Sequence, residues 1–329
     1  MRLRRLGTNG PAVSALGLGC MGMSGMYGPA DRRESLATIH AALEAGVTLI
    51  DTGDFYGMGH NEMLIGEALK AVPRDRAIVS VKFGALRDPR GGWSGFDGRP
   101  AAVRNFLAYS LQRLDLDYID IYRPARLDPA VPIEETVGAM SEAVQAGWVR
   151  HVGLSEVGAD TLRRASAVHP ICDVQLEYSL LSRGIELNVL PAARALGIAV
   201  TAYGVLSRGL ISDSNDESFG PSDFRSHAPR FQGEHLTHNR ALVQRLQPIA
   251  ARHGLSIAQL AIAWVAAQGD DIVPVIGTKR RSRLAEAIKA AAVDLTIADL
   301  VEIDDALPAG SAAGERYAPQ QMSQLDSER

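Results

Sequence analysis

The chain has 329 residues, of which 46% are apolar and 22% charged, and its formal net charge is −4. These values are typical of an ordinary globular protein with a large core, and they give no indication of a nucleic acid as partner. Residues 1–7 are basic, but Gly, Asn and Pro follow them instead of an apolar signal core. No apolar run is long enough to span a bilayer. We therefore expect a cytoplasmic protein with no membrane partner.

The two cysteines, Cys20 and Cys172, are too few for a disulfide framework. Both lie in apolar segments that resemble strands, which indicates reduced and buried thiols.

The predicted elements begin with a β-hairpin that turns at residues 8–11, and short apolar runs then alternate with segments of helical spacing. Several predicted helices end at a glycine that suits the position after a helix, as at Gly46, Gly147 and Gly197. The predicted strands are 15–20, 47–51, 78–82, 118–122, 149–154, 172–176, 198–203 and 272–276. The predicted helices are 32–45, 61–70, 101–114, 133–146, 158–167, 185–196, 239–253, 256–268 and 281–291, and the segments 84–100 and 207–238 are predicted as loops.

The regular alternation of strands and helices predicts the α/β class. The helical connections are long enough for right-handed parallel crossovers, so the pattern favours a (β/α)8 TIM barrel. The alternative is an open, doubly wound sheet, but no Gly-x-Gly-x-x-Gly follows the first strand to support it. No linker is visible, so we expect one domain over 1–329. Its polar segment 308–329 is expected to form a mobile tail that lies over the barrel mouth.

Three chemically distinctive residues lie at or just after predicted strand ends. Asp51 ends the second strand, Tyr56 follows five residues later, and Lys82 ends the third strand. In a TIM barrel these positions meet at one face. A tyrosine has a pKa of about 10, which a nearby ammonium would lower, and an aspartate would hold that ammonium in place. On residue types alone, a structural turn at Asp51 and Tyr56 is the favoured interpretation, and the alternative for Lys82 is a solvated lysine at a strand end.

Motifs in register along the chain distinguish these readings. Asp51-Thr52-x-x-x-Tyr56-Gly57 with Lys82 on the next strand resembles the aldo-keto reductase family, and the similarity runs from about residue 3 to about residue 300. Further segments of the same resemblance follow in the expected order, at 15–19, 147–155, 174–179, 203–209 and 276–279.

The resemblance implies an NADP(H)-dependent carbonyl reductase acting on a small-molecule aldehyde or ketone. Tyr56 would donate a proton to the carbonyl oxygen, Lys82 would lower the pKa of Tyr56, and Asp51 would orient Lys82. Ser155 and Gln175 would bind the nicotinamide carboxamide, and Tyr203 would stack on the ring; Glu156 stands where the family often has Asn. The remaining cofactor residues implied by the resemblance are Gly19, Cys20, Met21, Gly204, Leu206, Arg208, Gly209, Gly277, Thr278, Lys279, Arg283 and Glu286, and those implied for the substrate are Tyr27, Trp93, Arg123 and Ala125.

The preference for NADPH rests on the segment that opens the last predicted helix. Lys279 and Arg283 lie there, and cations beside free helix amides form an anion site that fits an adenosine 2′-phosphate. Arg283 and Glu286 match family positions, whereas Ala287 departs from the usual Asn. Without the resemblance, the same run would be read as a solvated helix face.

One position departs from the family pattern in a way that bears on catalysis. Alanine occupies residue 125, where the family has a histidine before Arg-x-Asp-Pro. Loss of one preorganised donor typically costs about 10²–10³ in rate. Three explanations remain open: another donor or a water replaces the histidine, the extra room admits a bulkier substrate, or cofactor binding is the main function. Arg123, Arg126 and His60 are candidate substitutes by proximity in sequence.

Two alternatives to a reductase follow from these observations. An NADPH-binding sensor or accessory protein resembling the potassium-channel β subunits is suggested by Ala125, and a barrel that binds a sugar phosphate or another anion remains a third possibility. The pair His235 and His238 has a spacing that some metal sites use, but no further ligand pattern accompanies it, so we expect no metal.

Overall fold

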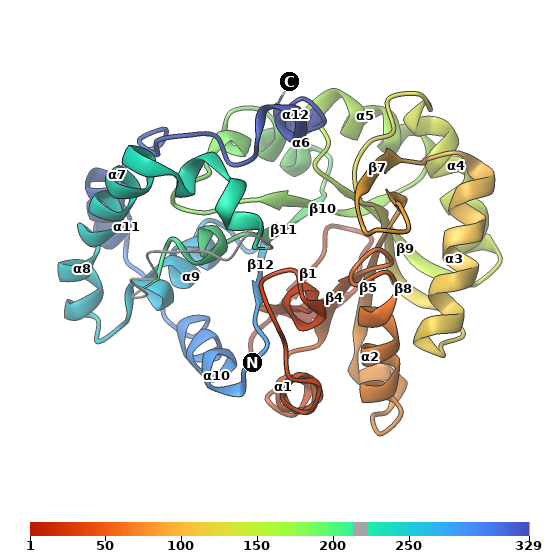
Figure 1. Ribbon diagram of the computed structural model, residues 1–329, viewed down its shortest axis with the longest axis horizontal. Coiled ribbons are helices and arrows are strands. Elements are labelled where there is room, and N and C mark those ends of the chain that lie inside the picture. Colours follow the sequence, from red (N-terminus) through yellow and green to blue (C-terminus); the bar gives the residue numbers. More distant parts are fainter. Residues whose placement is uncertain (213–222, 329) are drawn as a thin grey trace.

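The computed structural model describes residues 1–212 and 223–328. Its centre is a closed barrel of eight parallel strands in the order β10-β11-β12-β3-β4-β5-β8-β9 (Figure 1). The barrel strands are β3 (Gly17–Gly19), β4 (Leu49–Gly53), β5 (Ile78–Phe83), β8 (Ile119–Pro124), β9 (Val149–Ser155), β10 (Ile171–Glu177), β11 (Ala199–Tyr203) and β12 (Ile272–Gly277). The predicted (β/α)8 TIM barrel is therefore confirmed.

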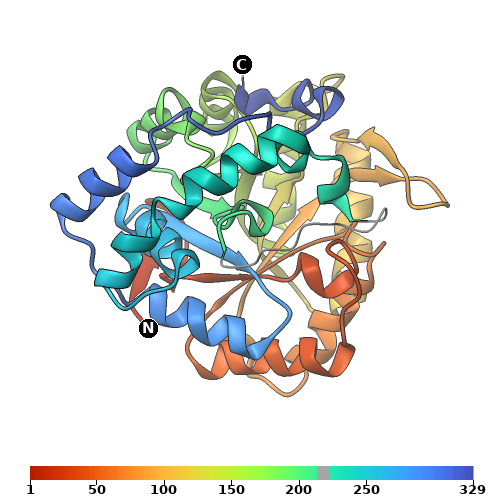
Figure 2. The same cartoon turned by 60° about the vertical axis from the view of Figure 1, so that its left-hand side comes forward.

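Helices surround the barrel and cover the outer faces of its strands (Figures 1 and 2). They are α1 (Arg32–Glu44), α2 (His60–Leu69), α3 (Pro100–Leu114), α4 (Ile133–Gln145), α5 (Ala159–Val168), α6 (Val189–Ala195), α7 (Gly233–Gln244), α8 (Gln247–Arg252), α9 (Ile257–Ala267), α10 (Arg281–Ala290), α11 (Ile297–Ala306) and α12 (Pro319–Met322). Short 3-10 helices lie at Met21–Ser24, Arg74–Arg76, Gly184–Glu186, Ser207–Gly209, Phe224–His227, Pro229–Phe231 and Asp326–Glu328.

The N-terminal hairpin closes one end of the barrel. Strands β1 (Leu3–Arg5) and β2 (Ala12–Ser14) pair antiparallel, as predicted. Leu6 and Val13 of this hairpin pack in the same buried cluster as Leu49 and Val273 of barrel strands. Because apolar side chains fill this end, the opposite end, where the strands terminate, is the one open to ligands.

A second, larger cluster of apolar side chains fills the space between the strands and the helices. Val79 and Val81 of β5, for example, are fully buried in it, as are Leu64 and Ile65 of α2. Burying such side chains stabilises the fold by about 1.5–3 kcal/mol each. The strand residues that face this layer are apolar, as are many that face the barrel interior. This is why the strands appear in the sequence as largely continuous apolar runs.

Several elements lie outside the simple alternation. The segment 84–100, predicted as a loop, contains a hairpin of β6 (Ala85–Arg87) and β7 (Trp93–Phe96), which projects beside the barrel mouth (Figure 2). The predicted loop 207–238 ends early because α7 begins at Gly233, and part of this loop, 213–222, lies outside the described residues. The predicted helix 239–253 is two helices, α7 and α8, and the unpredicted α11 follows α10.

The C-terminal segment crosses the barrel mouth, as predicted. It runs from α11 to α12 over the open end of the barrel (Figure 1). Arg316 and Leu325 are 5% and 2% exposed, so the segment packs into the mouth and does not only lie on it.

Candidate active site

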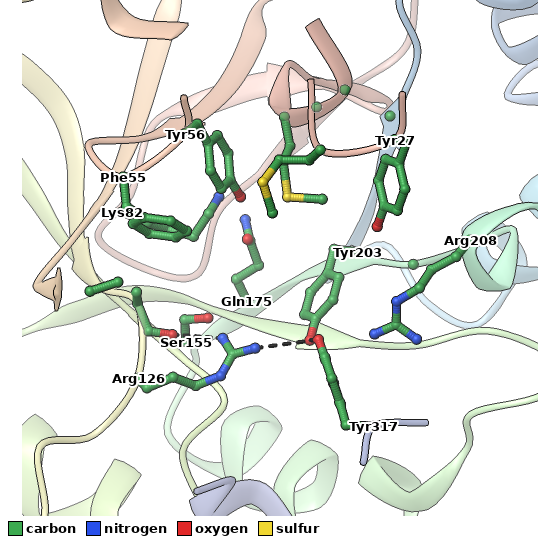
Figure 3. Close-up of a pocket in the computed structure, with 18 of the residues that line it drawn as sticks. Tyr27, Phe55, Tyr56, Lys82, Arg126, Ser155, Gln175, Tyr203, Arg208 and Tyr317 are labelled. Carbon is green, nitrogen blue, oxygen red and sulfur yellow. Dashed lines mark hydrogen bonds between the residues drawn. The ribbon is translucent and has the colours of Figure 1, made fainter. Parts of the chain in front are cut away.

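A cavity of about 1050 Å³ lies at the carboxyl ends of the barrel strands. Residues from separate strands and from the tail line it (Figure 3). The lining includes most of the site residues predicted from the sequence, namely Gly19, Met21, Tyr27, Asp51, Tyr56, Lys82, Trp93, Ala125, Ser155, Gln175, Tyr203, Gly204, Leu206, Arg208, Gly209, Gly277, Thr278 and Lys279.

The floor of the cavity holds the lysine, the aspartate and the tyrosine that the sequence places at strand ends. The Lys82 ammonium donates to Asp51 Oδ1, and Ser80 Oγ and Gln175 Nε2 donate to Asp51 Oδ2 at 3.0 and 2.8 Å. Lys82 Nζ also lies 5.2 Å from the centre of the Tyr56 ring. Neighbouring strands hold this arrangement, since Gly53 of β4 pairs with Lys82 of β5. The phenol, the ammonium and the carboxylate thus form one buried unit.

The protonation of this unit differs from the expectation in one respect. Burial, followed by the charge of Asp51, raises the pKa of Tyr56 well above its usual value. Burial also lowers the pKa of Lys82, although Asp51 opposes that effect. Burial and the charge of Asp51 therefore outweigh the lowering of the Tyr56 pKa that was expected from Lys82. The phenol therefore carries its proton at neutral pH, although a raised pKa also makes it a weaker acid.

Polar groups for a planar amide lie on the neighbouring strands β9 and β10. Ser155 is 1% exposed, and its Oγ has no hydrogen-bond partner although it lines the cavity. A buried hydroxyl without a partner is unusual and indicates a ligand group opposite it. Gln175 uses its amide nitrogen on Asp51 and lines the same wall.

The loop after β11 turns its backbone toward the cavity. Gly204, Ser207, Arg208 and Gly209 all have positive φ angles, between 45° and 92°. The N–H groups of Ser207 and Gly209 donate within the loop, to the carbonyls of Gly204 and Leu206 at 2.6 and 2.8 Å, so the turn is held by its own hydrogen bonds. Arg208 adds a guanidinium to this wall and donates to Glu177 Oε2 at 2.8 Å.

An ionic cluster missed in the sequence holds the tail on the barrel mouth. Arg316 donates to Glu156 Oε2 at 2.6 Å and to Glu177 Oε2 at 3.2 Å, and both carboxylates are almost fully buried. Glu156 Oε1 accepts from Tyr203 Oη at 2.8 Å. Burial opposes ionisation of Glu156, but Arg316 outweighs burial and holds the pKa of this carboxyl below its usual range. Glu156 is therefore a structural anion that positions Tyr203 and the tail.

The outer part of the cavity is aromatic and rich in amides. Phe55 lies edge-on to Trp93, with 5.5 Å between the ring centres. The guanidinium carbon of Arg87 lies over the Trp93 ring, 4.2 Å from its centre. The tail contributes Tyr317 and three glutamines that sequence reasoning did not identify, Gln320, Gln321 and Gln324. No local sequence pattern marks these tail residues, and only the fold brings them to the mouth.

Comparison with known proteins gives the family. The family model for the aldo/keto reductase family matches residues 15–308. The chain is 43% identical over 321 residues to a probable aldo-keto reductase of Glycine max, covering 95% of this chain and 91% of that protein. The chain belongs to the aldo-keto reductase family. This family carries out NAD(P)-dependent oxidoreduction of carbonyl compounds.

Solved aldo-keto reductases share the fold over nearly the whole chain. A glycerol dehydrogenase from Gluconobacter oxydans superposes with a TM-score of 0.85 at 29% identity, covering 96% of this chain and 97% of that one. An aldo/keto reductase from Klebsiella pneumoniae, solved with NADP and acetate, gives 0.75 at 25% identity and covers 97% and 99%.

The residues of the cavity fit the nicotinamide cofactor of aldo-keto reductases. The unpartnered Ser155 hydroxyl faces the space where a carboxamide would find a hydrogen bond, and Tyr203 offers a flat face beside it. The turn Gly204–Gly209 lines the same wall, and Arg208 of this turn offers a cation to a pyrophosphate. Gly277 has open space where a Cβ would project, so a ligand can approach the backbone there.

Four predicted site residues do not line the cavity. Cys20 is fully buried, and its thiol contacts the carbonyl of Leu18, so this side chain does not reach a cofactor. Arg283 lies on α10, where it pairs with Glu286 at 2.8 Å on an exposed face, so both remain candidates only for the adenosine end.

Arg123 is the prediction that the structure contradicts most directly. Its guanidinium is 0% exposed and pairs with Asp173 at 2.9 Å inside the barrel, and it donates to Thr201 Oγ1 at 3.0 Å. The side chain turns into the barrel below the cavity, so it cannot contact a substrate in the cavity. His60 also bonds elsewhere, with Nδ1 at 2.9 Å from Ser24 Oγ.

Lys279, expected to contact a phosphate, also bonds to a neighbouring loop at the edge of the cavity. Its ammonium donates to the carbonyl oxygens of Tyr27, Gly28 and Pro29 at 3.1, 3.4 and 2.6 Å. The lysine thus connects the loop after β12 to the loop after β3 and closes one side of the cavity.

The two histidines of the H-x-x-H pattern lie in the first half of α7. His235 Nδ1 lies 3.2 Å from the carbonyl of Pro229, and His238 Nε2 lies 2.9 Å from that of Ser311. Both rings therefore help join α7 to neighbouring segments. Across residues 1–212 and 223–328, no single helix has both the length and the apolar composition needed to cross a membrane, and only the pair 233–252 and 257–267, bent by 85°, meets the criteria together.

Proposed function

We propose that the protein is an NADPH-dependent carbonyl reductase of the alcohol dehydrogenase type, which reduces an aldehyde or ketone with Tyr56 as proton donor. The observation that carries this proposal is the buried unit of Asp51, Lys82 and Tyr56 on the cavity floor, next to the unpartnered hydroxyl of Ser155. A proton donor and a binding group for the nicotinamide amide therefore face one space.

Each residue of the unit has a distinct part in the proposed reaction. When bound, NADPH supplies the hydride that reduces the carbonyl carbon. Tyr56, kept protonated by burial, gives its proton to the carbonyl oxygen. Lys82 stabilises the phenolate that remains, and Asp51 fixes the ammonium through a buried ion pair. The aromatic wall of Phe55 and Trp93 excludes water and holds the apolar part of the substrate.

The proposal is tested by removing the acidic proton without changing the shape of the ring. Consumption of NADPH is followed by absorbance with a panel of aldehydes and ketones, for the wild-type protein and for Tyr56→Phe. We expect the variant to lose about 10²–10⁴ in kcat while it retains its affinity for NADPH. Undiminished turnover by Tyr56→Phe would refute Tyr56 as the proton donor.

A second candidate function is an NADPH-binding sensor or accessory protein, as in the potassium-channel β subunits. Ala125 favours it, because this residue lies in the cavity wall and provides no hydrogen-bond donor from its side chain. Tight binding of NADPH with negligible turnover on the whole panel would support this function, and ordinary turnover would exclude it.

A further inference from the structure

The cavity wall near Tyr56 contains an alanine followed by an arginine. Ala125, 2% exposed, and Arg126 both line the cavity, at the end of β8. Ala125 leaves space beside the cavity floor, and its side chain has no polar atom. Arg126, the next residue, carries the cation of this segment that lies nearest to this space.

The guanidinium of Arg126 is directed into the cavity and held there. Its Nη1 donates to the carbonyl of Ala125 at 2.7 Å, and its Nη2 donates to Tyr317 Oη at 3.4 Å. Figure 3 shows it extending between Ser155 and the pair of hydroxyls of Tyr203 and Tyr317. These two hydroxyls lie 3.0 Å apart, so the tail and β11 jointly limit its motion.

Within the described residues, Arg126 lacks the ion-pair partner that Arg208, Arg316 and Arg123 have. Arg208 and Arg316 each form an ion pair with Glu177, and Arg123 pairs with Asp173. By contrast, no carboxylate within residues 1–212 and 223–328 forms an ion pair with Arg126. A guanidinium has several N–H donors and no acceptor, and a partly buried one without a counter-ion attracts negative charge.

The charge of Arg126 also acts on the proton donor. Among the groups around Tyr56, Arg126 lowers the pKa of the phenol, against the dominant effect of burial. The positive charge of Arg126 therefore acts on the Tyr56 oxygen. A substrate carbonyl oxygen that accepts a hydrogen bond from Tyr56 would also lie within the electrostatic field of Arg126.

We propose that Arg126 is the second donor to the substrate's carbonyl oxygen and takes the place left by Ala125. The proposal rests on the proposed carbonyl reduction. As the C=O π bond breaks and hydride bonds to the carbon, negative charge develops on the oxygen. Arg126 stabilises this charge with an N–H hydrogen bond and keeps its own proton, while Tyr56 transfers the proton that completes the alcohol. The other two candidates, Arg123 and His60, are engaged outside the cavity.

The experiment compares Arg126→Met, which removes the charge at similar length, with Arg126→Lys, which keeps the charge but loses the planar fork. The readouts are kcat and KM for benzaldehyde and the Kd for NADPH. We expect Arg126→Met to lose about 10²-fold in kcat, Arg126→Lys to lose less, and NADPH affinity to change by less than about threefold. The double variant Ala125→His, Arg126→Met supplies a donor at the neighbouring position and recovers part of the rate. Arg104→Met, which removes an exposed guanidinium paired with Glu142, is the matched control.

A second readout does not depend on turnover. Benzoate, an anion that mimics the charged oxygen, is titrated by calorimetry into the protein saturated with NADP+. Wild type should bind it, and Arg126→Met should bind it at least about tenfold more weakly. Equal binding by both proteins, or no binding by wild type, would overturn the role of Arg126. If wild type reduces no carbonyl compound, only the proposed reductase function is refuted. The benzoate titration still tests whether Arg126 forms an anion site.

Discussion

Asp54 lies two residues before Tyr56 and shows how closely acids are packed behind the cavity. It is 7% exposed, and its neighbour Glu62 is fully buried. Asp54 Oδ1 has no hydrogen-bond partner, while Oδ2 accepts from the backbone N–H of Gly84 at 3.3 Å. Burial, together with the charge of Glu62, raises the pKa of Asp54 to about 7. Its charged form is therefore unfavourable in the folded protein.

This raised pKa predicts a specific pH dependence of stability. The folded protein holds the Asp54 proton to higher pH than the unfolded chain does, so wild type loses stability as the pH rises from about 4 to about 7. Asp54→Asn removes this loss and should be more stable than wild type by about 2 kcal/mol at pH 8, with no gain near pH 4. Urea unfolding at both pH values measures the difference. Asp115→Asn, at an exposed acid that ends α3, should show no such trend; an equal trend in both variants would contradict the prediction.

At the residue scale, the sequence predicted that Asp51, Tyr56 and Lys82 lie together, because they end or follow strands whose ends must meet. The same argument failed for Arg123, although Arg123 pairs directly with Lys82 in the barrel. Residue type and strand position do not determine whether a side chain points into the cavity or into the barrel. Asp173, which is distant in sequence, pairs with Arg123 inside the barrel. Of the three candidate substitutes for the histidine, Arg126 is the one that lines the cavity.

The start of α10 is the element that would meet the adenosine end of the cofactor. Its first turn contains Arg281 and Arg283, but Glu34 at the start of α1 accepts hydrogen bonds from the backbone N–H and the guanidinium of Arg281. The Arg281 guanidinium in turn lowers the pKa of Glu34, so this carboxylate stays charged. Glu34 thus places a negative charge beside the site proposed for the 2′-phosphate.

We therefore expect Glu34→Gln to change cofactor selectivity. Removing the negative charge lessens repulsion of the 2′-phosphate and weakens the competing ion pair with Arg281, so the Kd for NADPH should fall about threefold to tenfold. The Kd for NADH should not change, because NADH lacks that phosphate. Fluorescence titration with both cofactors measures the effect, and wild type should already prefer NADPH. An equal change for both cofactors would show that Glu34 acts through the fold of α1.

At the element scale, the eight strand and helix units were predictable. Each strand is a run of apolar residues, and each helix shows apolar residues at helical spacing. The β6–β7 hairpin was missed because the segment 84–100 is rich in glycine and proline and has little apolar alternation. The helix α11 did leave a signal that was not used. Thr296 and Asp299 form a capping box at its start, and this pattern is readable in the sequence.

The whole molecule depends on the contact between its tail and its barrel. Arg316→Met leaves Glu156 and Glu177 buried with fewer cations, so we expect a loss of about 3–5 kcal/mol in stability. Because Arg316 holds the pKa of Glu156 low, the lost stabilisation is the part that wild type has at neutral pH and loses as the pH falls.

A double variant separates this effect from simple packing. Adding Glu156→Gln to Arg316→Met removes the uncompensated charge, so the pair should lose less stability than the sum of the single changes. Denaturant unfolding of all four proteins gives the coupling. Additive losses would show that Arg316 contributes apolar contacts alone. The tail's place over the mouth was predictable from the resemblance, but this ionic cluster was not, because its members are far apart in sequence.

The position of Arg316 along the chain also bears on the order in which the protein is assembled during synthesis. Glu156 is made long before Arg316, and every barrel strand is complete by residue 277. Until the segment after α11 emerges, the Glu156 carboxylate has no arginine to pair with, and Tyr203 has no Tyr317 beside it. A nascent barrel therefore carries an unfinished cofactor pocket with an unpaired charge. A chain interrupted before residue 316 would still contain the barrel strands and helices α1 to α11, but it could not complete its cavity.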